Sequence, residues 1–226
     1  MPIAMFTITE DKIMTENYLT PLAYLYKWEK TRPNSIYLRQ PRNRIWQEYS
    51  WKDVADEARR MAAALADLNL KKGSRIAIIS KNCAEWIISD LAIMMSGCIS
   101  VPLYSTQSDD AIKYVLEHSG ASVIFVGKLD SPEQIQNAIP SNIQQIGFNY
   151  EGIHAPLMWN DLIRKYSPID KPYHPSLDDI FTIVYTSGTT GNPKGVVNDF
   201  RSAAFATTNS IRDFKLTHSE HAMSFL

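Results

Sequence analysis

The sequence contains few cysteines, which limits the covalent chemistry that it can carry. Only two of its 226 residues are cysteines, Cys83 and Cys98, and both lie in apolar surroundings without a CxxC pair or a neighbouring histidine cluster. A disulfide framework or a zinc site would need more cysteines, or cysteines and histidines at short spacings. We therefore interpret both as buried thiols of a protein in the reducing cytosol, which predicts a cytoplasmic location.

An excess of positive charge is also missing. Lysine and arginine together number 23 and aspartate and glutamate 24, so the formal net charge is -1. A protein that neutralises many phosphates of a nucleic acid usually shows a basic excess or a basic stripe. This balance gives no electrostatic reason to expect a nucleic-acid partner, and a hydrophobic content of 45% is typical of a globular protein.

The chain lacks a long uninterrupted apolar stretch. At the N-terminus, Glu10 and Asp11 come before an apolar segment of signal-peptide length can form. The longest weakly charged stretch, residues 91–108, is interrupted by Gly97, Pro102 and several serines. Neither secretion nor a membrane span is expected, whereas peripheral contact with a membrane stays open.

What the sequence does contain is a regular alternation of helical and strand patterns. Apolar residues at helical spacing alternate with short β-branched runs that suit buried strands. Such alternation predicts an α/β fold, a parallel sheet with crossover helices on both faces. In chain order the expected elements are a helix at 50–68, a strand at 75–80, a helix at 86–94, a strand at 98–103, a helix at 108–117, a strand at 122–126, a helix from 131, a strand at 143–148 and a helix at 159–166.

Several helix ends carry local signals. Ser50 and Asp53 have the spacing of a capping box, with Asp in place of the usual Glu or Gln. Ser108 can cap the helix that Gly120 is placed to end. Ser131 precedes a proline at the first helical position, which is a further start signal.

Glycine is scarce, and three of the 9 glycines lie in one stretch, YTSGTTGNPKG, at residues 185–195. A strand-like run precedes this stretch, and Asn198 or Asp199 can cap a helix after it. The inward face of this helix is expected to consist of Phe200, Ala203, Ala204, Thr207, Ile211 and Phe214. Glycines at 188, 191 and 195 would let the backbone turn through positive φ and bring its N–H groups close to an anion.

The other side chains of this stretch suit phosphate. Ser187, Thr189 and Thr190 add hydroxyl donors, and Lys194 adds a point charge. A Walker A loop is ruled out because Lys194 is followed by Gly195 rather than by Ser or Thr, and GxGxxG spacing is absent. The residues alone leave two interpretations open, a polyphosphate-binding loop of another kind and a mobile surface loop.

The stretch YTSGTTGNPKG resembles, nearly residue for residue, the phosphate-binding signature of the adenylate-forming superfamily. Residues 50–86, residues 97–106 and the terminal SFL resemble the N-terminal part of long-chain fatty acyl-CoA synthetases. The resemblance implies that residues 1–226 are the N-terminal portion of the AMP-binding large domain, without the rest of that domain or the C-terminal lid domain. After the Gly-Val step the superfamily commonly has a Thr-His or Ser-His pair where this chain has Asn198 and Asp199, so the superfamily is indicated more strongly than the subfamily.

The resemblance implies an ATP-dependent ligase. The carboxylate of a long-chain fatty acid would attack the α-phosphate of ATP with Mg²⁺ present, and the thiol of coenzyme A would then displace AMP. It implies no catalytic residue and no metal ligand within this chain, because the superfamily's remaining motifs lie downstream; the fragment alone is expected to be inactive. It assigns Lys194 to the β- and γ-phosphates and the phosphate cradle to Thr186, Ser187, Gly188, Thr189, Thr190 and Gly191.

Two alternatives stay open. The acid could be an aryl or amino acid, because the resemblance puts most residues that shape an acyl pocket after Leu226. The chain could also be a non-catalytic nucleotide-binding module. A homodimer is compatible with each of these hypotheses.

Other residues that could be taken for catalytic or metal-binding groups are expected to be structural. Tyr185 is interpreted as the packed end of a strand, and Glu85 as a first-turn residue of its helix. The five histidines show no metal spacing; they lie at positions 118, 154, 174, 218 and 221.

Overall fold

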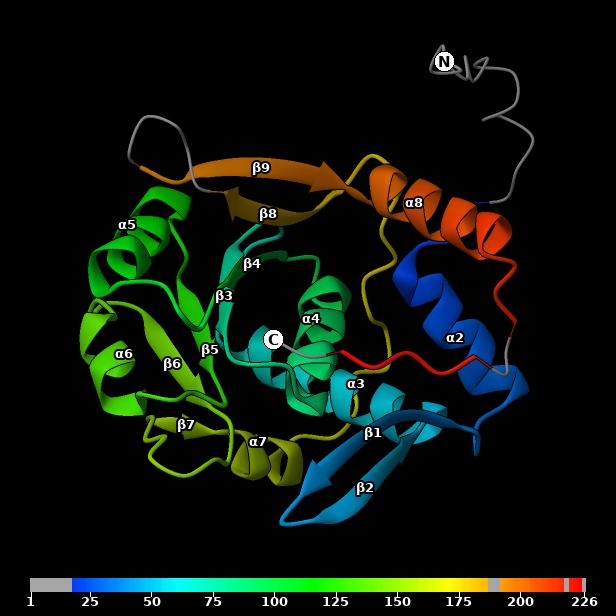
Figure 1. Ribbon diagram of the computed structural model, residues 1–226, viewed down its shortest axis with the longest axis horizontal. Coiled ribbons are helices and arrows are strands. Elements are labelled where there is room, and N and C mark those ends of the chain that lie inside the picture. Colours follow the sequence, from blue (N-terminus) through cyan, green and yellow to red (C-terminus); the bar gives the residue numbers. More distant parts are fainter. Residues whose placement is uncertain (1–17, 187–191, 218–219, 225–226) are drawn as a thin grey trace, which may run out of the picture.

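The fold is a twisted sheet with helices on both faces (Figure 1). The computed structural model describes residues 18–186, 192–217 and 220–224. In chain order the elements are α2 (Pro21–Thr31), β1 (Ile36–Arg42), β2 (Ile45–Ser50), α3 (Trp51–Asp67), β3 (Arg75–Ile79), α4 (Ala84–Met95), β4 (Ile99–Leu103), α5 (Asp109–Ser119), β5 (Val123–Val126), α6 (Pro132–Ala138), β6 (Gln144–Gly147), β7 (Leu157–Met158), α7 (Trp159–Lys165), β8 (Ile180–Thr186), β9 (Lys194–Asp199) and α8 (Phe200–Asp213).

The main sheet is mostly parallel. Within the described residues it has seven strands in the order β7-β6-β5-β3-β4-β8-β9. Each neighbouring pair from β7 to β8 is parallel, and β9 runs antiparallel to β8. The predicted α/β fold with a parallel sheet and helices on both faces is confirmed, and the antiparallel edge is an addition that the strand pattern did not predict.

The two faces of the sheet form two apolar clusters. On β3, Ile76 and Ile78 belong to the cluster under α2, α3, α4 and α7, whereas Ala77 and Ile79 belong to the cluster under α5 and α6. Side chains alternate between the faces of a strand, so a strand covered on both sides must be apolar at every position. This explains why the run at 76–79 shows no polar alternation.

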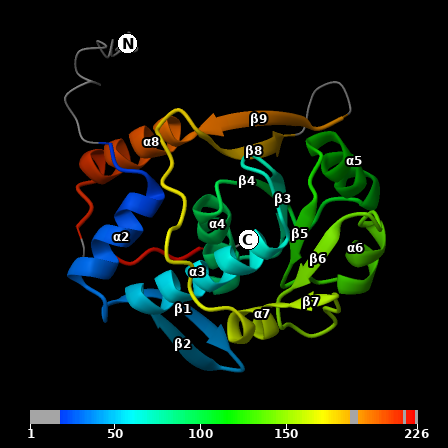
Figure 2. The ribbon, with the colours of Figure 1, turned by 180° about the vertical axis from the view of Figure 1, so that it is seen from behind.

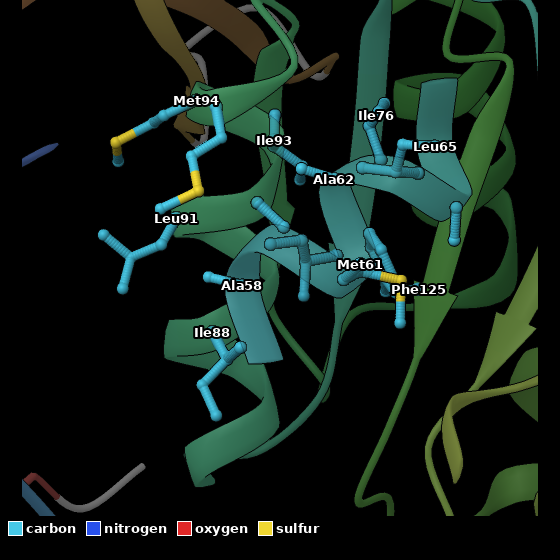
Figure 3. Packing of buried hydrophobic residues seen from close by; sticks show 14 of the residues in the cluster. Ala58, Met61, Ala62, Leu65, Ile76, Ile88, Leu91, Ile93, Met94 and Phe125 are labelled. Atoms are coloured by element: carbon cyan, nitrogen blue, oxygen red, sulfur yellow. The ribbon is translucent and has the colours of Figure 1, made fainter. Parts of the chain in front are cut away.

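The packing of α3 and α4 on the sheet forms the centre of the larger cluster (Figure 3). Met61 and Leu65 of α3, Ile88 of α4 and Ile76 of β3 are all 0% exposed. The alanines of α3, such as Ala58 and Ala62, lie between these larger side chains on the same face of the helix. Small residues at these positions let the two helices lie close to each other and to the sheet.

Most of the predicted helix ends are confirmed. Ser50 and Asp53 form a complete capping box, with the Ser50 N–H donating to Asp53 Oδ2 at 2.9 Å. Ser108 caps α5, and Gly120 ends that helix with a φ of 63°. Ser131 occupies the N-cap of α6, but its side chain makes no capping hydrogen bond.

Two N-terminal elements were not predicted, helix α2 and the hairpin of β1 and β2. Thr20 caps α2 and Pro21 stands at its first position, which is a start signal that the sequence does carry. The hairpin turns at Asn43 and Arg44, whose φ angles are 50° and 64°. It packs below α3 and α4 and extends beyond them, as both views of the ribbon show (Figures 1 and 2).

The cysteines are buried, as predicted, with Cys83 8% and Cys98 3% exposed. Burial raises the pKa of the Cys98 thiol to about 11, so this thiol is protonated at neutral pH. In the part of the chain that the structure describes, no helix has the length and apolar character to cross a membrane.

We expect Phe125→Ala to lower the free energy of unfolding by about 3–5 kcal/mol, because the side chain is fully buried and its loss leaves a cavity. Phe125 packs against Phe148 and Trp159 at ring-centroid distances of 5.9 Å and 6.3 Å. Urea denaturation measures the change. Ile45→Ala is the control: Ile45 is 73% exposed, so its loss should cost less than about 0.5 kcal/mol. Equal losses in the two variants would contradict the packing described for β5.

Candidate functional site

Strand β8 pairs only briefly with the parallel strand beside it. It pairs with β4 at one pair of residues, Ser100 and Thr182, where Thr182 Oγ1 donates to the Ser100 carbonyl at 3.1 Å. Two residues further along β4, Pro102 faces the same neighbour and has no N–H to donate. The ladder between β4 and β8 therefore stops at this pair, whereas the other edge of β8 pairs with β9 from Ile180 to Thr186.

The ribbon of β8 and β9 holds the two ends of the glycine-rich stretch together. Its register pairs Tyr185 with Gly195 and Thr186 with Lys194. Thr186 and Lys194 are both exposed. The structure thus brings two of the seven predicted phosphate-binding residues side by side at the open end of the ribbon, beside α5 (Figure 1). The other five lie outside the described residues; they are Ser187, Gly188, Thr189, Thr190 and Gly191.

Tyr185 anchors this end of the ribbon. It is 4% exposed, and its hydroxyl lies 2.7 Å from His118 Nδ1 at the end of α5. Burial raises the pKa of the Tyr185 hydroxyl. The side chain is therefore part of the core, in agreement with the interpretation from sequence, and His118 is a partner that sequence spacing did not reveal.

Gly195 does not have the role that the sequence suggested. It lies in strand β9 without a positive φ, so it is not a turn residue. A Cβ at this position would lie 3.0 Å from Ile183 Cγ2 and 3.2 Å from Tyr185 Cζ. A side chain here would be crowded by Ile183 and Tyr185, so the close approach of the two strands favours glycine.

Asp179 holds the other end of the ribbon. Its carboxylate accepts hydrogen bonds from Tyr173 Oη at 2.6 Å, from the Ser176 N–H at 2.8 Å and from Lys72 Nζ at 3.1 Å. Its carbonyl accepts from the Phe200 N–H at 2.9 Å. The hydrogen bond from Tyr173 is the main reason that the pKa of Asp179 falls to about 2. One acidic residue thus joins the proline-rich segment at residues 167–176 to the starts of β8 and α8.

Helix α8 follows β9 directly. Asp199 is its N-cap and accepts a hydrogen bond from the Ser202 N–H at 2.8 Å. Of the two predicted N-caps, Asn198 and Asp199, the structure therefore uses Asp199. The predicted inward face is only partly correct. Phe200 and Ala204 are buried, whereas Ile211 is 39% and Phe214 75% exposed.

A second polar cluster lies where the hairpin meets the sheet. The Ala84 N–H donates to Gln40 Oε1 at 2.6 Å, and Arg42 forms an ion pair with Glu85 while donating to Tyr150 Oη at 3.2 Å. Glu85 stands in the first turn of α4, as predicted, but its burial, at 5% exposed, and its ion pair were not predicted. A cavity of about 290 Å³ opens beside this cluster, between the hairpin and α7.

Solved structures define the class of this fold. The anthranilate CoA ligase AuaEII, solved in complex with anthranoyl-AMP, matches with a TM-score of 0.75 at 24% identity, over 86% of this chain and 37% of that chain. A benzoate CoA ligase from Burkholderia xenovorans matches with a TM-score of 0.69 at 20% identity, over 84% of this chain and 36% of that chain. The fold is that of the adenylate-forming ligases.

The sequence comparisons name the family. The AMP-binding enzyme family matches residues 25–226, and the chain belongs to this family. Fatty acyl-CoA synthetase A of Dictyostelium discoideum is 36% identical over 168 residues, which make up 66% of this chain and 25% of that protein. Long chain acyl-CoA synthetase 5 of Arabidopsis thaliana is 31% identical over 183 residues, 73% of this chain and 26% of that protein. The chain spans about a quarter of the length of these curated relatives, and its resemblance to long-chain acyl-CoA synthetases is confirmed.

The low pKa of Asp179 predicts a pH-dependent contribution to stability. Its folded value of about 2 lies below the ordinary 3.8, so the contribution is present above about pH 4 and is lost as the pH falls toward 2. We expect Asp179→Asn to be less stable than the native chain at pH 7, with a difference that narrows between pH 4 and pH 2. Urea denaturation at each pH measures it.

Asp178→Asn is the matched control. Its carboxylate is 79% exposed and pairs with Arg201 at 2.5 Å, so its loss should change the free energy of unfolding by less than about 1 kcal/mol. A difference for Asp179→Asn that stays constant from pH 7 to pH 2 would contradict the hydrogen-bond network described for this carboxylate.

Proposed function

We propose that the chain is the N-terminal portion of the AMP-binding large domain of a long-chain fatty acid-CoA ligase, which activates the acid with ATP and transfers it to coenzyme A. The observation that carries this proposal is the antiparallel pairing of Thr186 with Lys194, which closes the glycine-rich stretch of a member of the AMP-binding enzyme family. Backbone N–H groups, hydroxyls and one lysine at the end of a rigid ribbon suit the phosphates of ATP.

Activation is required because a carboxylate is a poor acyl donor to a thiol: oxide is too poor a leaving group at neutral pH. The carboxylate oxygen attacks the α-phosphorus of ATP, the bond to the bridging oxygen breaks, and pyrophosphate leaves. The sulfur of coenzyme A then attacks the acyl carbon, and AMP leaves with its oxygen. In both steps the leaving group is a stabilised anion, so the protein's task is to position the reactants and to stabilise negative charge.

We assign the stabilisation of the departing phosphates to the glycine-rich stretch. Lys194 donates a charge-assisted hydrogen bond to the β- and γ-phosphates, and the hydroxyl of Thr186 donates beside it. The cradle of N–H and hydroxyl donors is completed by Ser187, Gly188, Thr189, Thr190 and Gly191. The hydrogen bond between Tyr185 and His118 and the network around Asp179 hold both ends of the ribbon in place, which keeps Lys194 oriented before ATP binds.

Mg²⁺ belongs to this proposal as the counter-ion of ATP. In the described part of the chain, no group of three or more His, Cys, Asp or Glu side chains is placed to hold a metal ion. No step is therefore assigned to a metal held by this chain. We assign the carboxylates that hold Mg²⁺ and the catalytic residues to parts of the full-length protein outside this chain, because the chain matches only about a quarter of the relatives' length.

The names of the relatives support a long-chain fatty acid as the substrate, because those at 36% and 31% identity are called fatty acyl-CoA and long chain acyl-CoA synthetases. A second candidate is an aryl acid, since the structural neighbours include ligases named for anthranilate and benzoate. We place the reaction in the cytoplasm, which the two buried cysteines, both without a disulfide, support.

We expect Lys194→Ala in the full-length protein to lower the rate of ATP-dependent adenylation roughly ten- to hundredfold. The reason is the loss of one charge-assisted hydrogen bond, which contributes about 1.5–3 kcal/mol. Pyrophosphate exchange into ATP at saturating acid measures the change. Lys113→Ala is the control, because Lys113 is an exposed lysine of the neighbouring helix α5 and has no assigned role. Unchanged exchange in a folded Lys194→Ala variant would overturn the assignment of Lys194.

The substrate class is tested by the same exchange with a panel of long-chain, short-chain, aryl and amino acids. Exchange with long-chain acids alone supports the proposal, and exchange with aryl acids alone selects the second candidate. A folded full-length protein that binds ATP but exchanges with no acid would be a nucleotide-binding module without catalysis, and the proposed function would be wrong.

A further inference from the structure

The tip of the β1–β2 hairpin is a defined structure that projects from the body of the molecule. Asn43 and Arg44 both have positive φ, the conformation of a tight hairpin turn that matches the twist of the strands. In both views the turn lies beyond the helices that cover the base of the hairpin (Figures 1 and 2). The two residues after the turn, Ile45 and Trp46, therefore lie away from the core.

Both faces of the tip carry a large apolar side chain. Ile45 pairs with Arg42 and Trp46 pairs with Pro41, so these two neighbours point to opposite faces of the ribbon. Ile45 is 73% and Trp46 66% exposed. Residues further from the turn on the Ile45 face, such as Tyr49, are buried against the core, which shows where contact with the body ends.

The charges around the tip leave one cation without a partner. Arg39 pairs with Glu48 at 2.8 Å, Arg42 pairs with Glu85, and on the adjacent α7 Arg164 pairs with Asp161. Arg44, at the turn itself, is exposed and has no ion pair among the residues that the structure describes. The tip therefore combines an exposed indole, an aliphatic side chain and a free guanidinium.

The base of the hairpin is held firmly. Gln40 accepts from the Ala84 N–H and donates to Tyr150 Oη, and the guanidinium of Arg42 lies 4.9 Å from the Tyr150 ring. The exposed side chains at the tip are thus presented by a rigid support, although they contribute little to packing.

We propose that this hairpin tip, Asn43 to Trp46, binds the interface of an anionic lipid bilayer. Tryptophan and arginine are side chains that the headgroup region accommodates, because each combines an apolar or planar body with a polar group. A flat protein partner would cover one face of the ribbon and leave the other apolar side chain in water. A tip that enters the headgroup region is surrounded on both faces, which matches the placement of Ile45 and Trp46.

This inference goes beyond the proposed function and does not depend on it. Vesicle binding is measured without ATP, acid or coenzyme A, so its failure leaves the exchange experiment unaffected.

The test uses the full-length protein and vesicles of equal parts phosphatidylglycerol and phosphatidylcholine. On addition of vesicles we expect a blue shift of tryptophan emission and quenching by lipids with brominated acyl chains. Trp46→Phe is the reporter control: it keeps an aromatic ring, so it should still co-sediment with vesicles but lose the emission shift. An unchanged shift in Trp46→Phe, or no shift in the native protein, would overturn the proposal.

Binding variants measure the contributions of the tip. Trp46→Ser should weaken co-sedimentation about tenfold, through lost apolar burial. Arg44→Gln should weaken co-sedimentation about fivefold on anionic vesicles and little on pure phosphatidylcholine.

Phe214→Ser is the control variant. It removes a side chain that is 75% exposed at the end of α8, and it should leave vesicle binding unchanged. Equal losses in Phe214→Ser and Trp46→Ser would show a non-specific apolar effect. An emission shift that depends on protein concentration in the absence of lipid would indicate that the tip binds a second copy of this chain instead. Either result contradicts the proposal.

Discussion

The burial of both faces of the parallel sheet is the constraint on which the rest of the structure depends. Strand β3 lies between β4 and β5, and its residues Ile76 to Ile79 are all 0% exposed. With no water on either side, backbone groups of β3 must pair with neighbouring strands and side chains must be apolar. The helices are then forced onto opposite faces, α3 and α4 on one and α5 and α6 on the other. This places the carboxyl end of α5 where β8 and β9 can pack against it.

The candidate site arises where that regular arrangement stops. Pro102 removes a donor on the side of β4 that faces β8, and β8 continues as a ribbon with β9. Side-chain hydrogen bonds hold the ribbon at both ends, through Tyr185 with His118 at one and through Asp179 at the other. Lys194 itself is exposed, so it adds little to the core and its side chain is available to a ligand. Rigid support around an exposed cation is the arrangement that anion binding requires.

Much of the sheet and its helices could be predicted because each signal is local. The capping box of Ser50 and Asp53 and the left-handed Gly120 depend on residues within a few positions of one another. The hairpin of β1 and β2 was missed although its turn is also local, because Asn43 and Arg44 are not the Asn-Gly or Asp-Gly pair typical of such turns. The inward face of α8 was only partly correct, since periodicity shows that one side is apolar but not how far the covering partner extends.

The sequence by itself determined the fold class, the order of most elements and the family, because periodic apolar patterns and the stretch YTSGTTGNPKG are written in neighbouring residues. Tertiary structure alone decided that a side chain at position 195 would be crowded by Ile183 and Tyr185 and that Arg42 pairs with Glu85. It also decided that Ile45 and Trp46 remain in solvent. The physical reason is the same in each case: close packing and ion pairing depend on the distance between residues far apart in the chain, which only the folded arrangement of the elements sets.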